Sequence, residues 1–316
     1  MKVGVNIVHY GPSATPSGMQ ELVGRAHELG YHFIMLSDHI ALTSDVRGRY
    51  PEPFHDPLTI LAWLAGQFPG LQLGTSVMVL PYRHPLVLAS MTSAVQRFTS
   101  DPLLLGVGIG WANQEFDALG IAFGQRAEIS DEYLEVLTRY WDNHRFSYSG
   151  SHIKFRDVVG GGPPAGAPHP TIWVGGSSDA ALRRAVRFSS GWHPIWPEME
   201  WLSVRGVPRL RHLSRLANRP PPELCPRIAI RITGSPLGST RRAGEGSLKQ
   251  IRHDFVALAS LGATHVLVDL HADDPHLGLQ LSNDLRLLER IAAEILAWSS
   301  AAVARNAGGV EDDGEQ

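Results

Sequence analysis

Two ionisable side chains stand together in Ser37-Asp38-His39, directly after an apolar segment. That segment, residues 31–36, reads Tyr-His-Phe-Ile-Met-Leu and predicts a buried β-strand. In parallel α/β proteins, ligands bind at the carboxyl ends of the strands. Asp38 and His39 are therefore the first candidates for chemistry, because an imidazole can accept or donate a proton near neutral pH. The alternative is structural, with His39 in a loop that Asp38 holds in place.

A second candidate site is Gly175-Gly176-Ser177-Ser178, between a predicted strand, Thr171–Val174, and a helix expected to begin near Asp179. Paired glycines let backbone N–H groups turn toward an anion, and a helix N-terminus adds partial positive charge. The segment thus predicts a phosphate-binding turn, with an ordinary serine-capped turn as the alternative. Gly108 and Gly110 either admit a flat ring close to the backbone or only form turns.

A metal site is the competing interpretation of the polar strand ends. His9, His39, His193 and Asp269 are residue types that bind zinc or a pair of metal ions in hydrolases. Against this, the first strand ends in Val-His-Tyr rather than in a His-x-His pair, so we expect no metal. Four arginines are candidates for binding phosphates or carboxylates: Arg83, Arg126, Arg241 and Arg242.

Strands and helices alternate along the whole chain, which predicts a (β/α)8 TIM barrel with insertion loops at the carboxyl ends of the strands. A doubly wound sheet would need a Gly-x-Gly-x-x-Gly turn after its first strand, and the sequence has none there. We expect one domain over residues 1–300 and a disordered acidic tail over residues 301–316. The expected strands are Lys2–His9, Tyr31–Leu36, Leu71–Leu80, Leu103–Ile109, Thr171–Val174, Gly191–Ile195, Arg227–Thr233 and Thr264–Leu270.

The bulk composition narrows the class of protein. The 316 residues are 43% hydrophobic and carry a formal net charge of −3, which gives no reason to expect nucleic acid or a membrane surface as a partner. A single cysteine, Cys225, excludes an intrachain disulfide and a cysteine zinc cage. No apolar run reaches the roughly 20 residues that span a bilayer, and the first residues lack the layout of a signal peptide. We therefore expect a cytoplasmic protein.

Taken together, these segments resemble the bacterial luciferase-like monooxygenase superfamily, and they are most similar to its branch of coenzyme F420-dependent oxidoreductases. Two segments depart from the family pattern, residues 99–102 (Thr-Ser-Asp-Pro) and residues 189–192 (Ser-Ser-Gly-Trp), and neither includes the expected ring-binding residues. The resemblance covers Val3 to about Leu270 and depends on Ser37-Asp38-His39; Leu73 to Pro81 (LGTSVMVLP); Gly106 to Trp111 (GVGIGW) with Asn113, Glu115 and Phe116; and Ile172 to Ser178 (IWVGGSS) followed by Gly191-Trp192.

The resemblance implies a barrel that holds a flavin or deazaflavin at the carboxyl ends of its strands. It also implies a non-prolyl cis peptide at Ser76–Val77, and a His39 near the reactive end of the ring that Asp38 orients. A homodimer is a further family expectation. The cofactor contacts that it implies are Thr75, Ser76, Val77, Gly108 and Gly110 for the ring, and Gly175, Gly176, Ser177 and Ser178 for the phosphate.

The function expected from the resemblance is hydride transfer between F420 and an unidentified small organic substrate, with His39 exchanging a proton. The first alternative is an FMN-dependent monooxygenase, in which the reduced flavin reacts with oxygen. A non-catalytic flavin-binding protein and a metal-dependent hydrolase are more distant alternatives. Three tryptophans are candidate walls of the substrate pocket: Trp111, Trp192 and Trp196.

Overall fold

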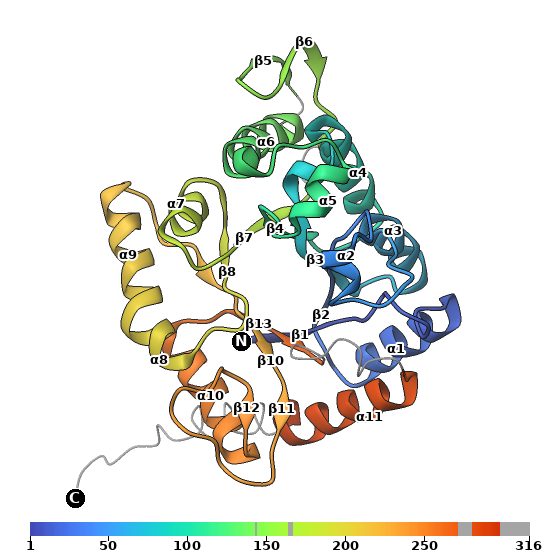
Figure 1. The fold of residues 1–316 in the computed structure, drawn as a ribbon, viewed down its shortest axis with the longest axis vertical. Helices are drawn as coiled ribbons and strands as arrows, with labels where there is room; N and C mark the ends of the chain where they lie inside the picture. The colour runs from blue at the N-terminus through green and yellow to red at the C-terminus, as the bar shows by residue number, and fades with distance from the viewer. Residues whose placement is uncertain (143, 164–166, 271–279, 298–316) are drawn as a thin grey trace, which may run out of the picture.

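The computed structural model describes residues 1–142, 144–163, 167–270 and 280–297, so the predicted acidic tail lies outside the described residues. One parallel sheet dominates the structure, in the order β10-β13-β1-β2-β3-β4-β7-β8-β9 (Figure 1). Its strands are β1 (Lys2–Asn6), β2 (Phe33–Leu36), β3 (Gln72–Val79), β4 (Leu104–Gly108), β7 (Thr171–Gly175), β8 (Gly191–His193), β9 (Glu223–Leu224), β10 (Arg227–Ala229) and β13 (His265–Asp269).

The sheet closes on itself because β9 and β10 are two parts of one extended segment. Cys225-Pro226 separates them, and proline has no N–H to donate to a ladder. The Cys225 N–H still donates to Trp192 beside β8, and the Pro226 carbonyl accepts from Leu267 of β13, each at 2.9 Å. The segment therefore joins both edges of the sheet, and the predicted eight-stranded barrel is confirmed.

Several predicted strand boundaries differ from those in the structure, and the end of the seventh strand differs most. The seventh strand was expected to run on to Thr233, but the barrel strand ends at Ala229. Beyond it, β11 (Arg231–Ile232) pairs with β12 (Glu245–Gly246) in a separate two-stranded sheet. The apolar pattern continues across the break between Ala229 and Arg231. The sequence therefore does not show that the chain leaves β13 and pairs with β12 instead.

Helices pack around the outside of the barrel (Figure 1). Local chemistry sets where they begin: Asp56 Oδ1 accepts from the Thr59 N–H at 2.9 Å, and Pro57 occupies the first turn of α3. The helices are α1 (Pro16–Glu28), α2 (Ser44–Arg47), α3 (Pro57–Gln67), α4 (Pro85–Arg97), α5 (Asn113–Ala118), α6 (Arg126–Trp141), α7 (Asp179–Phe188), α8 (Met199–Trp201), α9 (Val207–Leu216), α10 (Leu248–Leu261) and α11 (Leu281–Ile291).

A hairpin of β5 (Arg145–Ser149) and β6 (Lys154–Val159) extends away from the barrel (Figure 1). No helix in the described part of the chain is long and apolar enough to cross a membrane.

Large side chains fill the barrel interior, so the strand ends rather than the barrel axis provide the room for a ligand. Burial raises the pKa of the Cys225 thiol above its usual range, as expected for an inert core cysteine. The interior cluster consists of Phe33, Met35, Leu104, Trp173, Cys225 and Leu267.

Candidate active site

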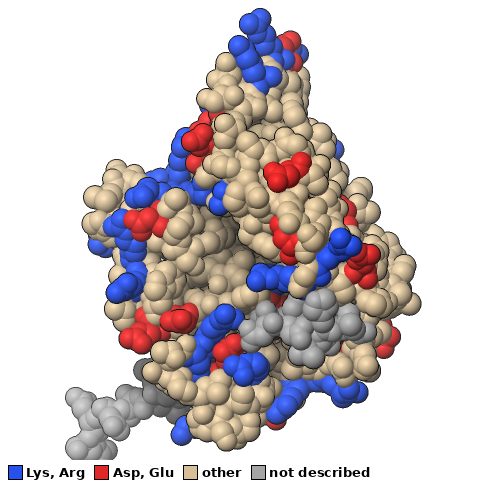
Figure 2. All heavy atoms as spheres, viewed as in Figure 1, with Lys and Arg blue, Asp and Glu red and all other residues tan. Residues whose placement is uncertain are grey.

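A cavity of about 350 Å³ opens at the carboxyl ends of the strands, a size suited to a small organic ligand. Figure 2 shows this face hollowed near its centre. Most of the residues predicted for the site line the cavity: Asp38, His39, Ser76, Val77, Gly108, Gly110, Gly175, Gly176 and Ser178. Ser37, Arg49, Tyr50, Trp111, Arg184, Trp196 and Arg227 are among the others that line it.

Three predicted residues lie elsewhere. Thr75 is fully buried, and its hydroxyl donates to the Gly106 carbonyl at 2.8 Å, so it supports the strands below the cavity. Ser177 lines a different surface hollow, next to α9, with Arg205 and Arg209. Trp192 is buried and donates from Nε1 to the Gly176 carbonyl at 2.8 Å, so it holds the glycine turn rather than walling the cavity.

The peptide bond between Ser76 and Val77 is cis, as the resemblance implied. The pairing of β3 with β4 shifts register at this point, between Thr75 and Met78. Four hydrogen bonds hold Ser76. Its hydroxyl donates to His193 Nε2 at 2.9 Å and accepts from Arg227 at 3.2 Å, and its carbonyl accepts from Arg227 at 2.7 Å and from the Ser37 hydroxyl at 3.2 Å. The cis peptide therefore has a defined position in the cavity wall.

His193 acts as an acceptor in this network. Its Nδ1 donates to the Cys225 carbonyl, which leaves Nε2 to accept from Ser76. Burial lowers the pKa of His193 to about 4, so the ring is neutral at physiological pH. Asp269 is bound by Arg227 and by Trp196 Nε1, and His39 is bound by Glu115. Three of the four residues considered as metal ligands are thus engaged with protein groups.

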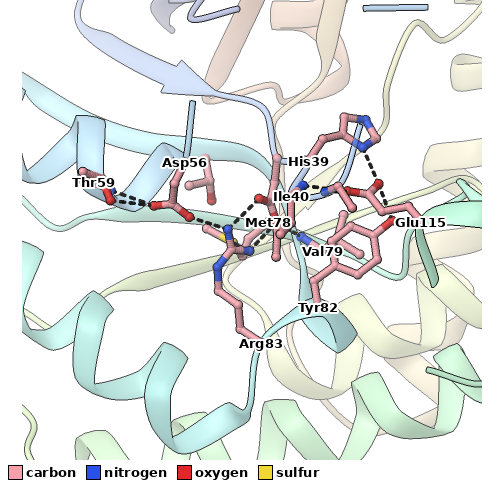
Figure 3. Close-up of polar contacts among 12 residues, drawn as sticks. His39, Ile40, Asp56, Thr59, Met78, Val79, Tyr82, Arg83 and Glu115 are labelled. Carbon is pink, nitrogen blue, oxygen red and sulfur yellow. Dashed lines mark hydrogen bonds and ion pairs between the residues drawn. The ribbon is translucent and has the colours of Figure 1, made fainter. Parts of the chain in front are cut away.

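The candidate proton-transfer group is a buried pair, His39 with Glu115 of α5 (Figure 3). His39 Nδ1 lies 2.6 Å from Glu115 Oε2, and their exposed fractions are 5% and 0%. Because a carboxylate only accepts, Nδ1 carries a proton and Nε2 is the free position. Among the described residues Nε2 has no hydrogen-bond partner, and the ring lines the cavity.

Glu115 is held by three further donors. The N–H groups of Ile40 and Ala41 donate to Oε1 at 2.6 and 2.9 Å, and the Tyr82 hydroxyl donates to Oε2 at 2.8 Å. Burial raises the pKa of Glu115, but these hydrogen bonds and His39 outweigh it, so the pKa lies below its usual value. An ionised Glu115 at neutral pH fixes the His39 tautomer, with the proton on Nδ1.

The expectation that Asp38 orients His39 is wrong in this structure. Asp38 Oδ2 accepts from the Val79 N–H at 2.9 Å, and both carboxylate oxygens accept from Arg83, at 2.7 and 2.9 Å. Arg83 also donates to Asp56 at 2.6 Å (Figure 3). Asp38 therefore anchors β3 beside the cis peptide, and Arg83, one of the four predicted arginines, meets this carboxylate at the site.

The predicted phosphate turn contains a glycine in a backbone conformation that other residues rarely adopt. Gly176 has a φ of +102°, and a side chain there would place its Cβ 3.0 Å from that of Ala181. Ser178 caps α7 by accepting from the Ala181 N–H at 3.2 Å. Arg184, which lies about one turn of α7 after Ala181, lines the same cavity and pairs with Asp131 at 2.6 Å.

The sequence model of the luciferase-like monooxygenase family matches residues 1–237. The chain belongs to this family. An FMNH2-dependent dimethylsulfone monooxygenase of Pseudomonas putida is 30% identical over 156 residues, which are 48% of this chain and 41% of that protein. The chain thus aligns with less than half of that relative's length.

Solved structures with a similar fold include one enzyme described with F420 and one described with FMN. An F420-dependent secondary alcohol dehydrogenase, in complex with an F420–acetone adduct, superposes with a TM-score of 0.70 at 12% identity, over 91% of this chain and 98% of its own. The oxygenating constituent of 3,6-diketocamphane monooxygenase from Pseudomonas putida, in complex with FMN, gives 0.71 at 16% identity, over 93% and 98%. At these identities the likeness shows the fold alone. Membership in the family supports an oxidoreductase, with both coenzymes represented among its neighbours.

Proposed function

We propose that this protein is an F420-dependent oxidoreductase that transfers a hydride between the deazaflavin and a small organic substrate. The observation that supports this most is the buried His39–Glu115 pair on the cavity wall. Hydride transfer to or from a carbon that bears oxygen must be balanced by a proton on that oxygen. A tautomer-fixed imidazole with a free Nε2 is suited to that exchange.

The residues present fit such a coenzyme. The Ser76–Val77 peptide and the backbone at Gly108 and Gly110 would lie against the ring, since these positions line the cavity. The turn at Gly175 and Gly176 would hold the phosphate, next to the N-terminus of α7. F420, when bound, supplies a ring carbon that takes up or releases a hydride.

The chain's own contribution is proton exchange and orientation. For an alcohol substrate, the hydroxyl proton goes to His39 Nε2 as the hydride leaves the carbon, and the imidazolium forms against the ionised Glu115. In the reverse direction Nε2 returns the proton to the carbonyl oxygen. Glu115 keeps Nδ1 protonated throughout, because its hydrogen bonds hold its own pKa low.

An anaerobic assay tests the proposal. The protein is mixed with reduced F420 and a panel of small ketones and aldehydes, and with oxidised F420 and the matching alcohols, and F420 absorbance is followed. We expect turnover in the absence of oxygen. Turnover that occurs only with reduced FMN and oxygen contradicts the proposal.

An FMN-dependent monooxygenase is the second candidate, favoured by the 30% identity to the dimethylsulfone monooxygenase. The same cavity would serve a flavin, and His39 would then act on the oxygenated substrate. The predicted homodimer and cytoplasmic location accompany either candidate and are checked by size-exclusion chromatography with light scattering and by cell fractionation.

Replacing Glu115 by glutamine should lower kcat by about 10-fold to 100-fold, because the imidazolium loses its counter-charge. Steady-state kinetics at neutral pH measure this loss. The matched control is Asp117→Asn on the exposed face of the same helix. A normal kcat in Glu115→Gln would return Glu115 to a purely structural role.

Replacing Gly176 by valine should weaken coenzyme binding by about tenfold or more, because the new side chain crowds Ala181 and disfavours the positive φ. The control is Gly30→Val, which introduces the same backbone conflict at a φ of +85° where nothing lies within 4 Å. Fluorescence titration gives both dissociation constants. Equal constants for the two variants would argue that the turn binds no phosphate.

A further inference from the structure

We infer that Arg49 forms an anion-binding subsite at the mouth of the cavity, and that the substrate is a flat organic anion of the carboxylate or sulfonate type. This inference rests on the proposed function, because it names the substrate class of the same site. Two features support it: the position of Arg49 beside His39, and the pairing of the other charges that line the cavity.

Arg49 lies on the His39 side of the cavity. Its guanidinium carbon is 5.0 Å from the centroid of the Trp111 ring. The His39 ring centroid is 5.6 Å from that of Trp111 and 5.2 Å from that of Tyr50. An anion bound by Arg49 would therefore have its apolar part against these aromatic rings and within reach of the candidate proton donor.

The other cations that line the cavity are already paired. Arg184 is bound to Asp131 and Arg227 to Asp269, while Asp38, the one carboxylate among the described residues that line the cavity, is bound by Arg83. Within the part of the chain that the structure describes, Arg49 contacts Trp111 and Tyr50 but no carboxylate. It therefore gives the mouth an uncompensated positive charge.

Arg49 belongs to the loop after β2, whereas the predicted phosphate turn follows β7, with β3 and β4 between these strands in the sheet. Its contacts are with Trp111 and Tyr50, the two rings next to His39. These contacts favour the substrate over the coenzyme phosphate as the ligand of Arg49. Figure 2 shows Lys and Arg side chains at the edge of the hollow.

The chemistry favours a planar anion. A guanidinium presents two parallel N–H groups that match the two oxygens of a carboxylate, or two of the three oxygens of a sulfonate. Aromatic walls from Tyr50, Trp111 and Trp196 favour a flat apolar body next to that group. An uncharged molecule of the same shape would gain the ring contacts and forgo the charge-assisted hydrogen bonds.

Paired probes test the inference: 2-naphthoate, and 2-naphthamide of the same shape without the charge. Each is titrated calorimetrically into the protein, with and without saturating coenzyme. We expect 2-naphthoate to bind about tenfold more tightly than the amide. Arg49→Gln should remove that preference, and Arg49→Lys should keep part of it. The matched control is Arg47→Gln, since Arg47 is exposed on α2 and is not among the residues that line the cavity.

Two results would overturn the inference. One is that the acid shows no charge-dependent preference through Arg49: the acid and the amide bind the unchanged protein with equal affinity, or the tighter binding of the acid survives Arg49→Gln. The other is a loss of coenzyme affinity in Arg49→Gln, which would assign Arg49 to the coenzyme instead. Failure of the proposed function looks different: the protein then binds no F420, while the naphthoate preference is still measurable without coenzyme.

Discussion

Replacing His39 by alanine should lower turnover by about 100-fold or more while the coenzyme dissociation constant changes by less than about threefold. The imidazole is the group with a free nitrogen on the cavity wall, and its removal takes away the proton exchange that balances hydride transfer. The coenzyme contacts, by contrast, come from backbone at Ser76–Val77 and at the glycine turn. Stopped-flow measurement of the hydride step, together with a fluorescence titration, separates the two effects.

The control for His39→Ala is His27→Ala, an exposed histidine on α1 that should leave kcat unchanged. Thermal unfolding of both variants shows whether the fold is intact. Because Glu115 loses one of its four donors in His39→Ala, a modest fall in stability is expected. Unchanged turnover in a folded His39→Ala protein would remove His39 from the mechanism.

Replacing Arg83 by leucine should lower the free energy of unfolding by about 3–5 kcal/mol. Arg83 is the counter-ion of the buried Asp38 and also bridges it to Asp56. Burial already raises the pKa of Asp38, and Arg83 opposes that shift. Without the guanidinium, the carboxyl is left in the interior with the Val79 N–H as its remaining partner among the described residues.

Urea unfolding at neutral pH measures this loss, with Arg25→Leu as the control. Arg25 also pairs with two carboxylates, Glu28 and Glu289, but all three side chains are exposed to solvent, so its loss should cost much less than the loss of Arg83. In the double variant Asp38→Leu, Arg83→Leu the cost should be less than additive, because no unpaired charge remains. Equal losses for Arg83→Leu and Arg25→Leu would show that Asp38 does not depend on its partner.

The sequence was sufficient to place the barrel strands and most of the cavity residues. Short apolar runs bounded by glycine and polar residues mark strands such as Phe33–Leu36, whereas the cis peptide at Ser76–Val77 was implied by the family resemblance. Apolar runs and turn chemistry are local signals, since they act over a few residues. They fail where a strand changes partner, as between Ala229 and Arg231.

The partners of the site residues could not be predicted in the same way. Glu115 is 76 positions from His39, and Arg83 is 45 positions from Asp38. These contacts exist because the closed barrel brings the loops after β2, β3 and β4 together. Glu115 belongs to the motif after Trp111, so it could be seen in the sequence. However, an acidic residue at the start of a helix is also explained by its favourable interaction with the helix dipole. From the sequence, Asp38 is the expected partner of His39 because the two are adjacent in the chain. In the structure the Asp38 carboxylate is bound by the Val79 N–H and by Arg83.

Parallel anaerobic titrations of the purified protein with F420 and with FMN test the central claim most directly. We predict saturable binding of F420 in the micromolar range or tighter, weakened in Gly176→Val, and binding of FMN that is at least about 100-fold weaker. Micromolar binding of FMN without measurable binding of F420 would contradict the account and identify the protein as a flavin-dependent member of the family.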